Sequence, residues 1–430
     1  MPAAKWNRRP THDTGHLPSL DVYQDLYKHF HAHPELSHLE SETAARVTEE
    51  LRSLGSYDIF TNIGETHGVA AVLKNGEGAT VLLRADMDGL PVEEKTGLEY
   101  ASKTRMRDSE GVERPTMHAC GHDMHITSLL ATAKLMLDAK KAWRGTLILC
   151  FQPAEEKGAG AKAMVEGNGG LYTKVPIPDV VLGAHVMPGR AGSLETKRGL
   201  VASAADSFRV TLHGRSGHGS QPHRTIDPIV MAASTVLRLQ TIVSREVDPY
   251  NCPAVVTVGS IHAGDAENII PEHAEIKLNI RTLDPETRAH VLEGTRRIIN
   301  AEAMASNAPQ EPELESLSNF PFLNNDDEVT TGIETTFAGI FPGRPHGYSS
   351  DGPRLGGSED FGILATSVNR PSCFWTYGGT DPAVWDEKEK EGKLKEIPIN
   401  HSSYFAPVIM PTLKVAIEGL AGGALTWLAT

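Results

Sequence analysis

The densest chemistry in the chain lies at residues 117–125, which run Met-His-Ala-Cys-Gly-His-Asp-Met-His. Within nine positions they place three imidazoles, one thiol and one carboxylate. Gly121 separates Cys120 from His122, and its backbone freedom permits a tight turn that aims both side chains at one point. Thiolate and neutral imidazole are preferred ligands of Zn(II) and related metals. The spacing predicts part of a metal site, although a redox or nucleophilic cysteine is compatible with it too.

Further metal-binding side chains follow separate apolar runs. Glu155 and Glu156 come after Phe-Gln-Pro-Ala, His185 follows Gly-Ala, and His401 lies near the C-terminus. Taken singly, a histidine at a strand end is more often a satisfied polar residue, and a Glu-Glu pair is usually solvated surface. Their combination with the Cys/His pair indicates a metal site that is assembled by tertiary folding.

Composition limits the classes of protein that this chain can belong to. It has 430 residues, of which 40% are hydrophobic and 22% charged, so a sizeable core and about two or three domains are expected. The formal net charge of −14 argues against a nucleic-acid partner, because phosphate binding requires a basic surface.

Cysteine usage and hydropathy bear on the compartment. The four cysteines are too few to staple a chain of this size, and a metal-binding cysteine suits a reducing environment. The N-terminal residues lack the apolar core of a signal peptide. No apolar run reaches the ~18–20 residues that cross a bilayer. We expect a soluble, cytoplasmic protein without a membrane partner.

The elements that must position these residues alternate in the first half of the chain. Helical patterns are expected at 21–31, 41–54, 126–139 and 159–166, and strands at 69–73, 80–83, 146–151 and 180–186. Short apolar strands between helices predict a largely parallel sheet covered on both faces. Functional groups gather beyond the carboxyl ends of such strands, where Asp86, Glu155, Glu156 and His185 fall.

The order of the expected helices and strands changes in the middle of the chain. Strands are expected at 205–213, 255–261, 274–282 and 311–316, and Asp-Pro pairs open helices that run to about 243 and 304. This β-α-β-β-α-β order is the ferredoxin-like unit. We therefore predict an α/β protein in which residues 1–200 and 316–430 form a catalytic domain and residues 201–315 an inserted lid domain. The α/β pattern then resumes with helices near 327–340 and 406–428 and a strand at 372–377, and the Lys/Glu-rich run 386–396 is expected to be a solvated loop.

Ordered motifs from about residue 20 to 425 carry a family resemblance. The chain strongly resembles the hippurate hydrolase / indole-acetyl-amino-acid hydrolase branch of the aminoacylase–carboxypeptidase metalloenzyme family. The motifs are Arg84-Ala-Asp86-Met-Asp88-Gly-Leu-Pro, Met-His-Ala-Cys120-Gly-His122-Asp-Met-His, Phe-Gln-Pro-Ala-Glu155-Glu156, Gly-Ala-His185, Gly-Arg-Ser-Gly-His218-Gly-Ser-Gln-Pro-His223, Glu267-Asn268-Ile-Ile-Pro, Gly-Ser-Glu359-Asp360-Phe and Asn-His401-Ser-Ser-Tyr-Phe.

The resemblance implies an amidohydrolase with two divalent metal ions per subunit and a lid through which two or more copies assemble. Cys120 would bridge the metals, Glu155 would be the general base, and the other ligands would be His122, Glu156, His185 and His401. More distant aminoacylases and carboxypeptidases have a metal-binding histidine where this chain has Arg84. The thiolate favours Zn(II), whereas the branch is also associated with Mn(II), Co(II) or Ni(II).

Other roles follow from the same resemblance. Asp86 is expected to act catalytically by orienting a ligand imidazole, with a loop or helix cap as its structural alternative. His218 would stabilise the oxyanion in the partner subunit's site, and His223 competes for that role. Asn268 would lie near the substrate carbonyl. Arg281 would hold a free carboxylate, unless it forms an ordinary surface ion pair.

The expected activity is hydrolysis of an N-acyl amino acid by a metal-activated water. A metallo-carboxypeptidase or dipeptidase on the same scaffold is the nearest enzymatic alternative. A catalytically silent binding protein and a hydrolase with Cys120 as nucleophile are two more. The silent protein would bind no divalent ion, and the cysteine hydrolase would be insensitive to chelators.

Overall fold

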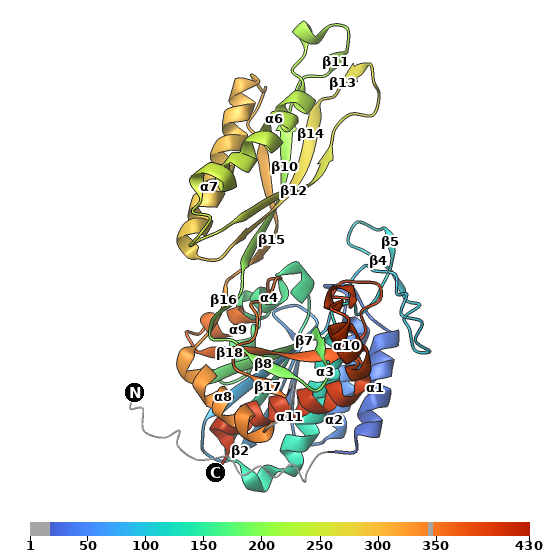
Figure 1. The fold of residues 1–430 in the computed structure, drawn as a ribbon, viewed down its shortest axis with the longest axis vertical. Coiled ribbons are helices and arrows are strands. Elements are labelled where there is room, and N and C mark those ends of the chain that lie inside the picture. Colours follow the sequence, from blue (N-terminus) through green and yellow to red (C-terminus); the bar gives the residue numbers. More distant parts are fainter. Residues whose placement is uncertain (1–17, 343–346) are drawn as a thin grey trace. The chain divides into compact units, whose positions relative to one another are not determined.

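The computed structural model describes residues 18–342 and 347–430. The chain divides into two compact units (Figure 1). The first comprises residues 1–201, 324–354 and 360–430, and the second comprises residues 202–323 and 355–359. Residues 1–17 lie outside the described residues. The expectation that the N-terminus lacks a signal-peptide core falls on these residues.

The first unit is built on an eight-stranded sheet, which Figure 1 shows edge-on between helices. Neighbouring strands β6, β3, β7 and β18 are mutually parallel, whereas β1, β2 and β8 join antiparallel. The order across the sheet is β1 (Asp58–Ile63), β2 (Gly68–Asn75), β6 (Gly145–Gln152), β3 (Thr80–Asp86), β7 (Val180–Arg190), β18 (Ser372–Thr380), β8 (Leu194–Thr196) and β17 (Tyr348–Ser349).

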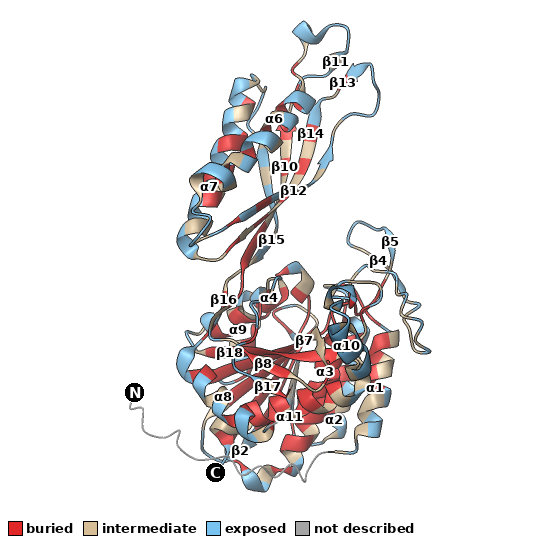
Figure 2. Ribbon diagram, in the orientation of Figure 1, coloured by how far each residue is buried: buried red, intermediate tan, exposed pale blue. Residues whose placement is uncertain are grey.

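Helices cover the sheet and bury its strands (Figure 2). In β3, the consecutive residues Val81, Leu82 and Leu83 are all fully buried, as expected when both faces of a sheet are covered. The helices of this unit are α1 (Leu20–Ala32), α2 (Ser41–Ser53), α3 (His122–Asp138), α4 (Gly160–Glu166), α5 (Leu171–Lys174), α8 (Asp327–Ile340), α9 (Gly362–Thr366), α10 (Pro382–Lys390) and α11 (Ile409–Leu428).

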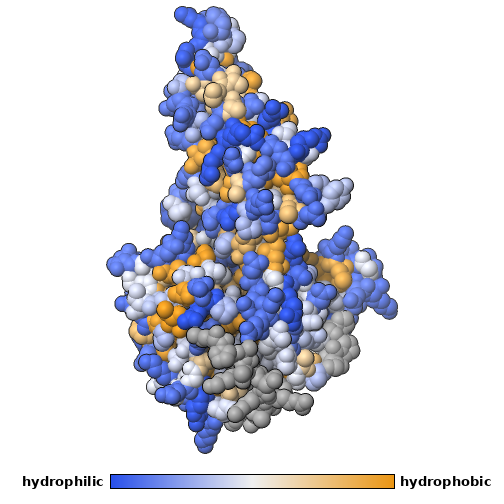
Figure 3. Space-filling model, turned by 90° about the vertical axis from the view of Figure 1, so that its left-hand side faces the viewer, coloured by the Kyte–Doolittle hydropathy of each residue, from blue (hydrophilic) through white to orange (hydrophobic). Residues whose placement is uncertain are grey.

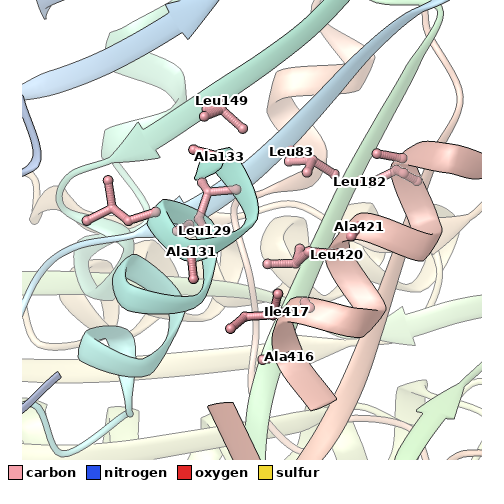
Figure 4. Close-up of a cluster of buried hydrophobic side chains, with 14 of the residues drawn as sticks. Leu83, Leu129, Ala131, Ala133, Leu149, Leu182, Ala416, Ile417, Leu420 and Ala421 are labelled. Atoms are coloured by element: carbon pink, nitrogen blue, oxygen red, sulfur yellow. The ribbon is translucent and has the colours of Figure 1, made fainter. Parts of the chain in front are cut away.

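The core of the first unit lies where α3 and α11 pack together on one face of the sheet. Each fully buried leucine there stabilises the fold by about 1.5–3 kcal/mol relative to exposure. α3 is buried along nearly its whole length, so its first turn is held firmly in place. Figure 4 shows the contributing side chains Leu83, Leu149 and Leu182 from the strands, Leu129, Ala131 and Ala133 from α3, and Ala416, Ile417, Leu420 and Ala421 from α11.

The second unit is a four-stranded antiparallel sheet with two helices. Its order is β12 (Val255–His262), β14 (His273–Thr282), β10 (Ala204–His213) and β15 (Glu313–Phe320), and the helices are α6 (Pro228–Thr241) and α7 (Pro285–Ala305). In chain order these strands are arranged 4-1-3-2 across the sheet, which is the ferredoxin-like arrangement. The predicted fold class, an α/β protein with an inserted ferredoxin-like α+β unit, is confirmed.

Short ribbons complete the described part of the chain: β4 (Arg105–Arg107) with β5 (Glu113–Pro115), β11 (Gly217–His218) with β13 (Ile269–Ile270), and β9 (Gly199–Ala202) with β16 (Leu323–Asn325). Among the helices that the structure describes, none combines the length and apolar character needed to span a membrane.

The expectation of a loop at 386–396 is wrong for residues 386–390, which belong to α10 (Pro382–Lys390), whereas most of the run is exposed as expected. Asp381 caps this helix by accepting hydrogen bonds from the Ala383 and Val384 N–H groups at 2.8 and 3.3 Å. Proline occupies the first turn, where its missing N–H costs nothing. The Asp-Pro signal that predicted α6 and α7 therefore occurs here as well, although the charged run after it resembles a loop.

Candidate metal centre

The end of β3 supplies two buried carboxylates, Asp86 and Asp88. Asp86 accepts a 2.6 Å hydrogen bond from Nη1 of Arg84, whose side chain is also fully buried. Burial alone would raise the pKa of Asp86, but Arg84 and the neighbouring imidazoles His122 and His125 hold that pKa well below its usual range. Asp86 is thus a fixed negative charge at the carboxyl edge of the sheet.

The turn that carries Cys120 and His122 depends on Gly121. Its φ of 86° is left-handed, and a Cβ there would lie 2.4 Å from a methyl carbon of Val186. Since only glycine fits both the torsion and the space, the two ligand side chains can flank this turn. His122 then begins α3, four residues before the helix start expected from the apolar pattern.

The Glu155–Glu156 turn follows β6 and is fixed by acidic side chains from elsewhere. The carboxylate of Asp88 accepts the N–H groups of Glu155 and Glu156 at 3.2 and 3.1 Å. Oε1 of Glu40 accepts the N–H of Ala154 at 2.7 Å. The backbone of this turn is therefore anchored, and its two glutamate side chains lie in the same buried region as His122.

His185 and His401 reach the same place from different elements. His185 lies within β7, and its Nε2 is 3.5 Å from Sγ of Cys120. The backbone N–H of His401 donates to the Ala119 carbonyl at 2.8 Å, and its Nε2 lies 3.3 Å from Oε1 of Glu156. His401 is the exposed member, with 54% of its side chain accessible, so solvent reaches the cluster on that side.

All five residues that the sequence suggested as ligands take part in overlapping groups of side chains whose donor atoms lie within 4.8 Å of one another. One group contains the thiol of Cys120, another contains Glu155, and a third adds a histidine that the sequence analysis did not assign. The groups are Cys120, Glu156 and His401; His122, Glu155 and Glu156; and Asp86, His122, His125 and His185.

The acidic side chains of the cluster favour a bound cation. Burial, together with the charges of Glu156 and Glu155, raises the pKa of the Cys120 thiol well above its usual value. Burial lowers the pKa of His122, but Asp86 and Asp88 outweigh it and raise that pKa to about 10. Negative charge thus accumulates here, and the thiol ionises only if a positive charge lies beside it.

The donor atoms fit a divalent metal. Nε2 of His122 and Oε1 of Glu156 are buried and make no hydrogen bond within the described ranges. Buried polar atoms without partners are costly, so they indicate ligands for a bound group. Thiol, imidazole and carboxylate together suit Zn(II) and its neighbours in the first transition row.

Asp86 and Asp88 both contact imidazole rings of the cluster. Nδ1 of His122 faces Oδ1 of Asp88 at 3.3 Å, whereas its Nε2 lies 3.6 Å from Oδ2 of Asp86. Asp86 makes its shorter contact, 2.5 Å, with Nδ1 of His125. Asp88 and His125 both lie within sequence motifs given above, but only the fold shows which atoms they contact.

The residues proposed for substrate binding belong to the second unit. His218 in β11 is exposed, and its Nδ1 accepts from the N–H of Ser220 at 3.1 Å. His223, in a 3-10 turn at Pro222–Arg224, and Asn268, in a turn, are both exposed. Arg281 in β14 is half-buried and donates to the Gly356 carbonyl and to Oγ of Ser358, each at 3.3 Å.

Relatives of known activity cover most of the chain. A hippurate hydrolase of Campylobacter jejuni is 40% identical over 394 residues, which span 91% of this chain and 97% of that protein. Thermostable carboxypeptidase 1 of Saccharolobus solfataricus is 37% identical over 320 residues, 73% of this chain and 77% of that protein.

Similarity extends to solved structures. A Bacillus subtilis protein described as a dinuclear metal-binding peptidase of the M20 family superposes with a TM-score of 0.70 at 27% identity, covering 94% of this chain and 97% of that one. The model of peptidase family M20/M25/M40 matches residues 82–397, which include both units. The metal-ligand chemistry, the two-unit fold and these matches agree, and the chain belongs to peptidase family M20/M25/M40.

Proposed function

We propose that this chain is a metal-dependent amidohydrolase that cleaves the amide bond of N-acyl amino acids. The observation that carries the proposal is the buried set of thiol, imidazole and carboxylate donors within 4.8 Å of one another, with Glu155 among them. The similarity to a hippurate hydrolase over nearly the whole chain supports the substrate class, since hippurate is an N-acyl amino acid. The products are a carboxylic acid and a free amino acid.

Cys120, His122, Glu156, His185 and His401 would hold two divalent metal ions. When bound, the two ions polarise the amide carbonyl and acidify the attacking water. The positions of the five side chains in overlapping groups support this assignment. The thiolate favours Zn(II), and Mn(II), Co(II) and Ni(II) are the other candidates.

Glu155 acts as the general base. It is buried, its Oε2 lies 4.0 Å from Nε2 of His122, and its backbone is anchored by Asp88. It accepts the proton of the attacking water and delivers that proton to the nitrogen of the leaving amino acid. His218 stabilises the oxyanion, with His223 as the alternative, while Asn268 lies near the substrate carbonyl and Arg281 binds the carboxylate.

Metal removal tests this proposal. A strong chelator should abolish hydrolysis, and Zn(II), Mn(II) or Co(II) should restore it. The Cys120→Ala variant should lose most of its bound metal as well as its activity. A cysteine nucleophile predicts the reverse: alkylation inhibits and chelation does not. Full activity in a rigorously metal-free sample would contradict the proposal, and absence of any divalent-ion binding would favour a silent binding protein.

A second candidate, carboxypeptidase or dipeptidase activity, is favoured by the 37% identity to thermostable carboxypeptidase 1. Both reactions hydrolyse an amide next to a free carboxylate, so the same metal site and Arg281 would serve either. The two activities differ in the group that lies on the acyl side of the cleaved amide bond. The metal-reconstituted enzyme should be assayed with N-benzoyl, N-acetyl and indole-acetyl amino acids beside dipeptides and blocked peptides. A higher kcat/KM for peptides would make this chain a peptidase.

We also propose that the chain forms a homodimer, or a larger assembly of identical chains, through the second unit. One edge of its sheet is β12, where Val255 and Ile261 are half-exposed, and α6 exposes Val230 and Leu237 at 65% and 74%. Figure 3 shows apolar residues at the surface of this unit among polar ones. An unpaired strand edge beside apolar residues suits association between copies of the chain. Sedimentation of the wild type and of Leu237→Glu tests it: the variant should dissociate.

A further inference from the structure

The imidazole of His125 has both ring nitrogens engaged inside the protein. Its Nδ1 contacts Oδ1 of Asp86 at 2.5 Å, and its Nε2 accepts the N–H of Val186 at 2.9 Å. Because Nε2 is an acceptor, the proton lies on Nδ1 and donates to Asp86. Proximity alone groups His125 with Asp86, His122 and His185 as a candidate ligand. Neither nitrogen has a lone pair left for a metal.

The peptide group of Val186 connects His125 to the metal ligands. Its carbonyl accepts from Nδ1 of His185 at 2.7 Å and from Nδ2 of Asn400 at 3.2 Å. The bond from His185 places its proton on Nδ1, which leaves the Nε2 lone pair free on the side of Cys120, 3.5 Å away. Asn400 also donates to the Cys120 carbonyl at 3.1 Å.

The other end of this chain of hydrogen bonds is rigid. Arg84 donates from Nη1 to Asp86 and from Nε to Oε1 of Gln152 at 2.9 Å. Gln152 donates in turn to Oδ1 of Asp360 at 2.6 Å. Arg84, Asp86, Gln152 and Asp360 are all buried, so the network is screened from water and restricts Asp86 strongly.

We propose that His125 is a positioning residue for the metal centre and not a ligand. Its Nε2 accepts the Val186 N–H and so orients His185 and Asn400 through that peptide, while Asp86 fixes the tautomer that leaves Nε2 an acceptor. This inference rests on the proposed two-metal function. The charge of Arg84 orients the Asp86 carboxylate.

Two substitutions separate the two bonds of His125. In His125→Gln the amide reaches about as far as Nε2, so its oxygen can accept the Val186 N–H. In His125→Asn the amide reaches about as far as Nδ1, so only the bond to Asp86 is kept. His125→Leu keeps neither bond. The readout is Co(II) bound to the otherwise metal-free enzyme, because its visible spectrum reports ligand geometry and its thiolate band reports Cys120.

Wild type and His125→Gln should bind two equivalents of Co(II) with similar spectra. His125→Asn and His125→Leu should bind Co(II) about 10–100-fold more weakly, the usual effect of losing a group that orients ligands, with shifted bands. Wild-type affinity and spectra in all three variants would overturn the inference. Loss of one full equivalent in all three, Gln included, would make His125 a ligand and overturn it equally.

Thr132→Val is the matched control. Thr132 is buried in the same helix, and its Oγ1 donates only to the Ser128 carbonyl, at 2.8 Å. This variant should lower thermal stability slightly and leave the Co(II) spectrum unchanged. If His125→Leu fails to fold, the Gln and Asn variants still decide. Absence of Co(II) binding and of chelator-sensitive activity in the wild type would contradict the proposed function instead, so the two failures are distinguishable.

Discussion

The chemistry-bearing residues of the two units are held in opposite ways. In the first unit, Cys120, His122 and His185 are almost completely buried, and anchored backbone or charged neighbours surround each one. In the second unit, His218 is exposed, and its Nδ1 contacts the backbone N–H and Oγ of Ser220 at 3.1 and 2.8 Å. The buried imidazoles of the first unit thus contact groups distant in sequence, whereas the exposed imidazole of His218 contacts a residue two positions away.

Folding alone therefore positions the buried side chains of the first unit, whereas the exposed side chains of the second unit reach their functional positions only on binding. A metal site needs donors within a few tenths of an ångström of their final places, and burial among packed helices supplies that precision. Residues that meet the substrate only during turnover need no such restraint. We therefore expect changes in the first unit to alter metal content and chemistry, and changes in the second unit to alter transition-state binding and assembly.

The largest effect expected in the first unit comes from the two adjacent glutamates. Glu155→Gln keeps the shape of the side chain but removes the proton acceptor, so kcat should fall by roughly 10²–10⁴-fold with normal metal content. Glu156→Gln should weaken metal binding, because Oε1 of Glu156 lies between His122 and His401 at 3.9 and 3.3 Å. Excess metal should partly restore its rate.

Elemental analysis beside kcat is the measurement for both variants, and each serves as the other's control. If Glu155→Gln lost metal while Glu156→Gln kept it with no turnover, the two roles would be exchanged. If both lost metal equally, the anchored turn would act as one unit and the division of labour would be wrong.

The second effect tests whether the exposed histidine of the second unit acts across a dimer. His218→Ala and Glu155→Gln should each be nearly inactive alone. After subunit exchange of equal amounts, about half of the dimers are mixed, and one of their two sites is intact, so about a quarter of wild-type activity should return.

The control for this experiment is His223→Ala mixed with Glu155→Gln. Recovery only in the His223 mixture would assign the oxyanion role to His223. Subunit exchange without recovery in either mixture would show that neither histidine acts in trans, and the contrast between the units would then lie in burial alone.

Periodicity sufficed to predict the longer strands of the two main sheets, namely β2, β3, β6, β7 and β18 in the first unit and β10, β12, β14 and β15 in the second. Buried strands such as β3 and β6 produce continuous apolar runs, and acidic or histidine residues after them stand out. Strand β1 was missed because its mostly exposed and partly buried positions show no clear alternation, and β8 and β17 were missed because they have only 3 and 2 residues. Helix α10 was missed because its charged residues conceal the Asp381-Pro382 start.

Partner atoms were beyond the reach of the sequence. Asp86 and Asp88 are two residues apart in one motif, and spacing gave no reason to place Asp88 rather than Asp86 at Nδ1 of His122. His125 lies within one of the motifs, but the sequence predicted no role for it. Its partner is a backbone N–H of β7, more than fifty positions away. Such contacts are tertiary, so only the fold reveals them.

The third effect concerns pH and sharpens the contrast in burial. Burial lowers the pKa of His31, but hydrogen bonds to Asp123 and Glu94, at 2.6 and 2.9 Å, outweigh it and raise that pKa to about 9. A raised pKa means that the imidazolium stabilises the folded state fully below pH 6.5, and that this stability is lost as pH rises through about 9. The contribution is on the order of 3 kcal/mol.

Urea unfolding between pH 6 and pH 9.5 measures this effect. The wild type should lose stability across that window, and His31→Gln should be less stable at pH 6 with a flatter profile. His213→Gln is the control from the second unit, where the ring meets Glu313 near the surface at 3.1 Å, and it should keep the wild-type profile. A wild-type profile in His31→Gln would show that His31 is not charged in the folded protein.

The smallest effect is expected at Arg281, whose guanidinium has no ion-pair partner within residues 18–342 and 347–430. It donates only to neutral oxygens of Gly356 and Ser358, so its charge remains available for a substrate carboxylate. Arg281→Met should raise KM about 10–100-fold for an N-acyl amino acid, the effect of losing a charge-assisted hydrogen bond, with metal content unchanged. The matched substrate is the corresponding amino-acid amide, which lacks the carboxylate and should be hydrolysed equally by both proteins. Equal losses on the acid and the amide would mean that Arg281 only supports the loop at 356–358, and the second unit would then contribute no carboxylate recognition.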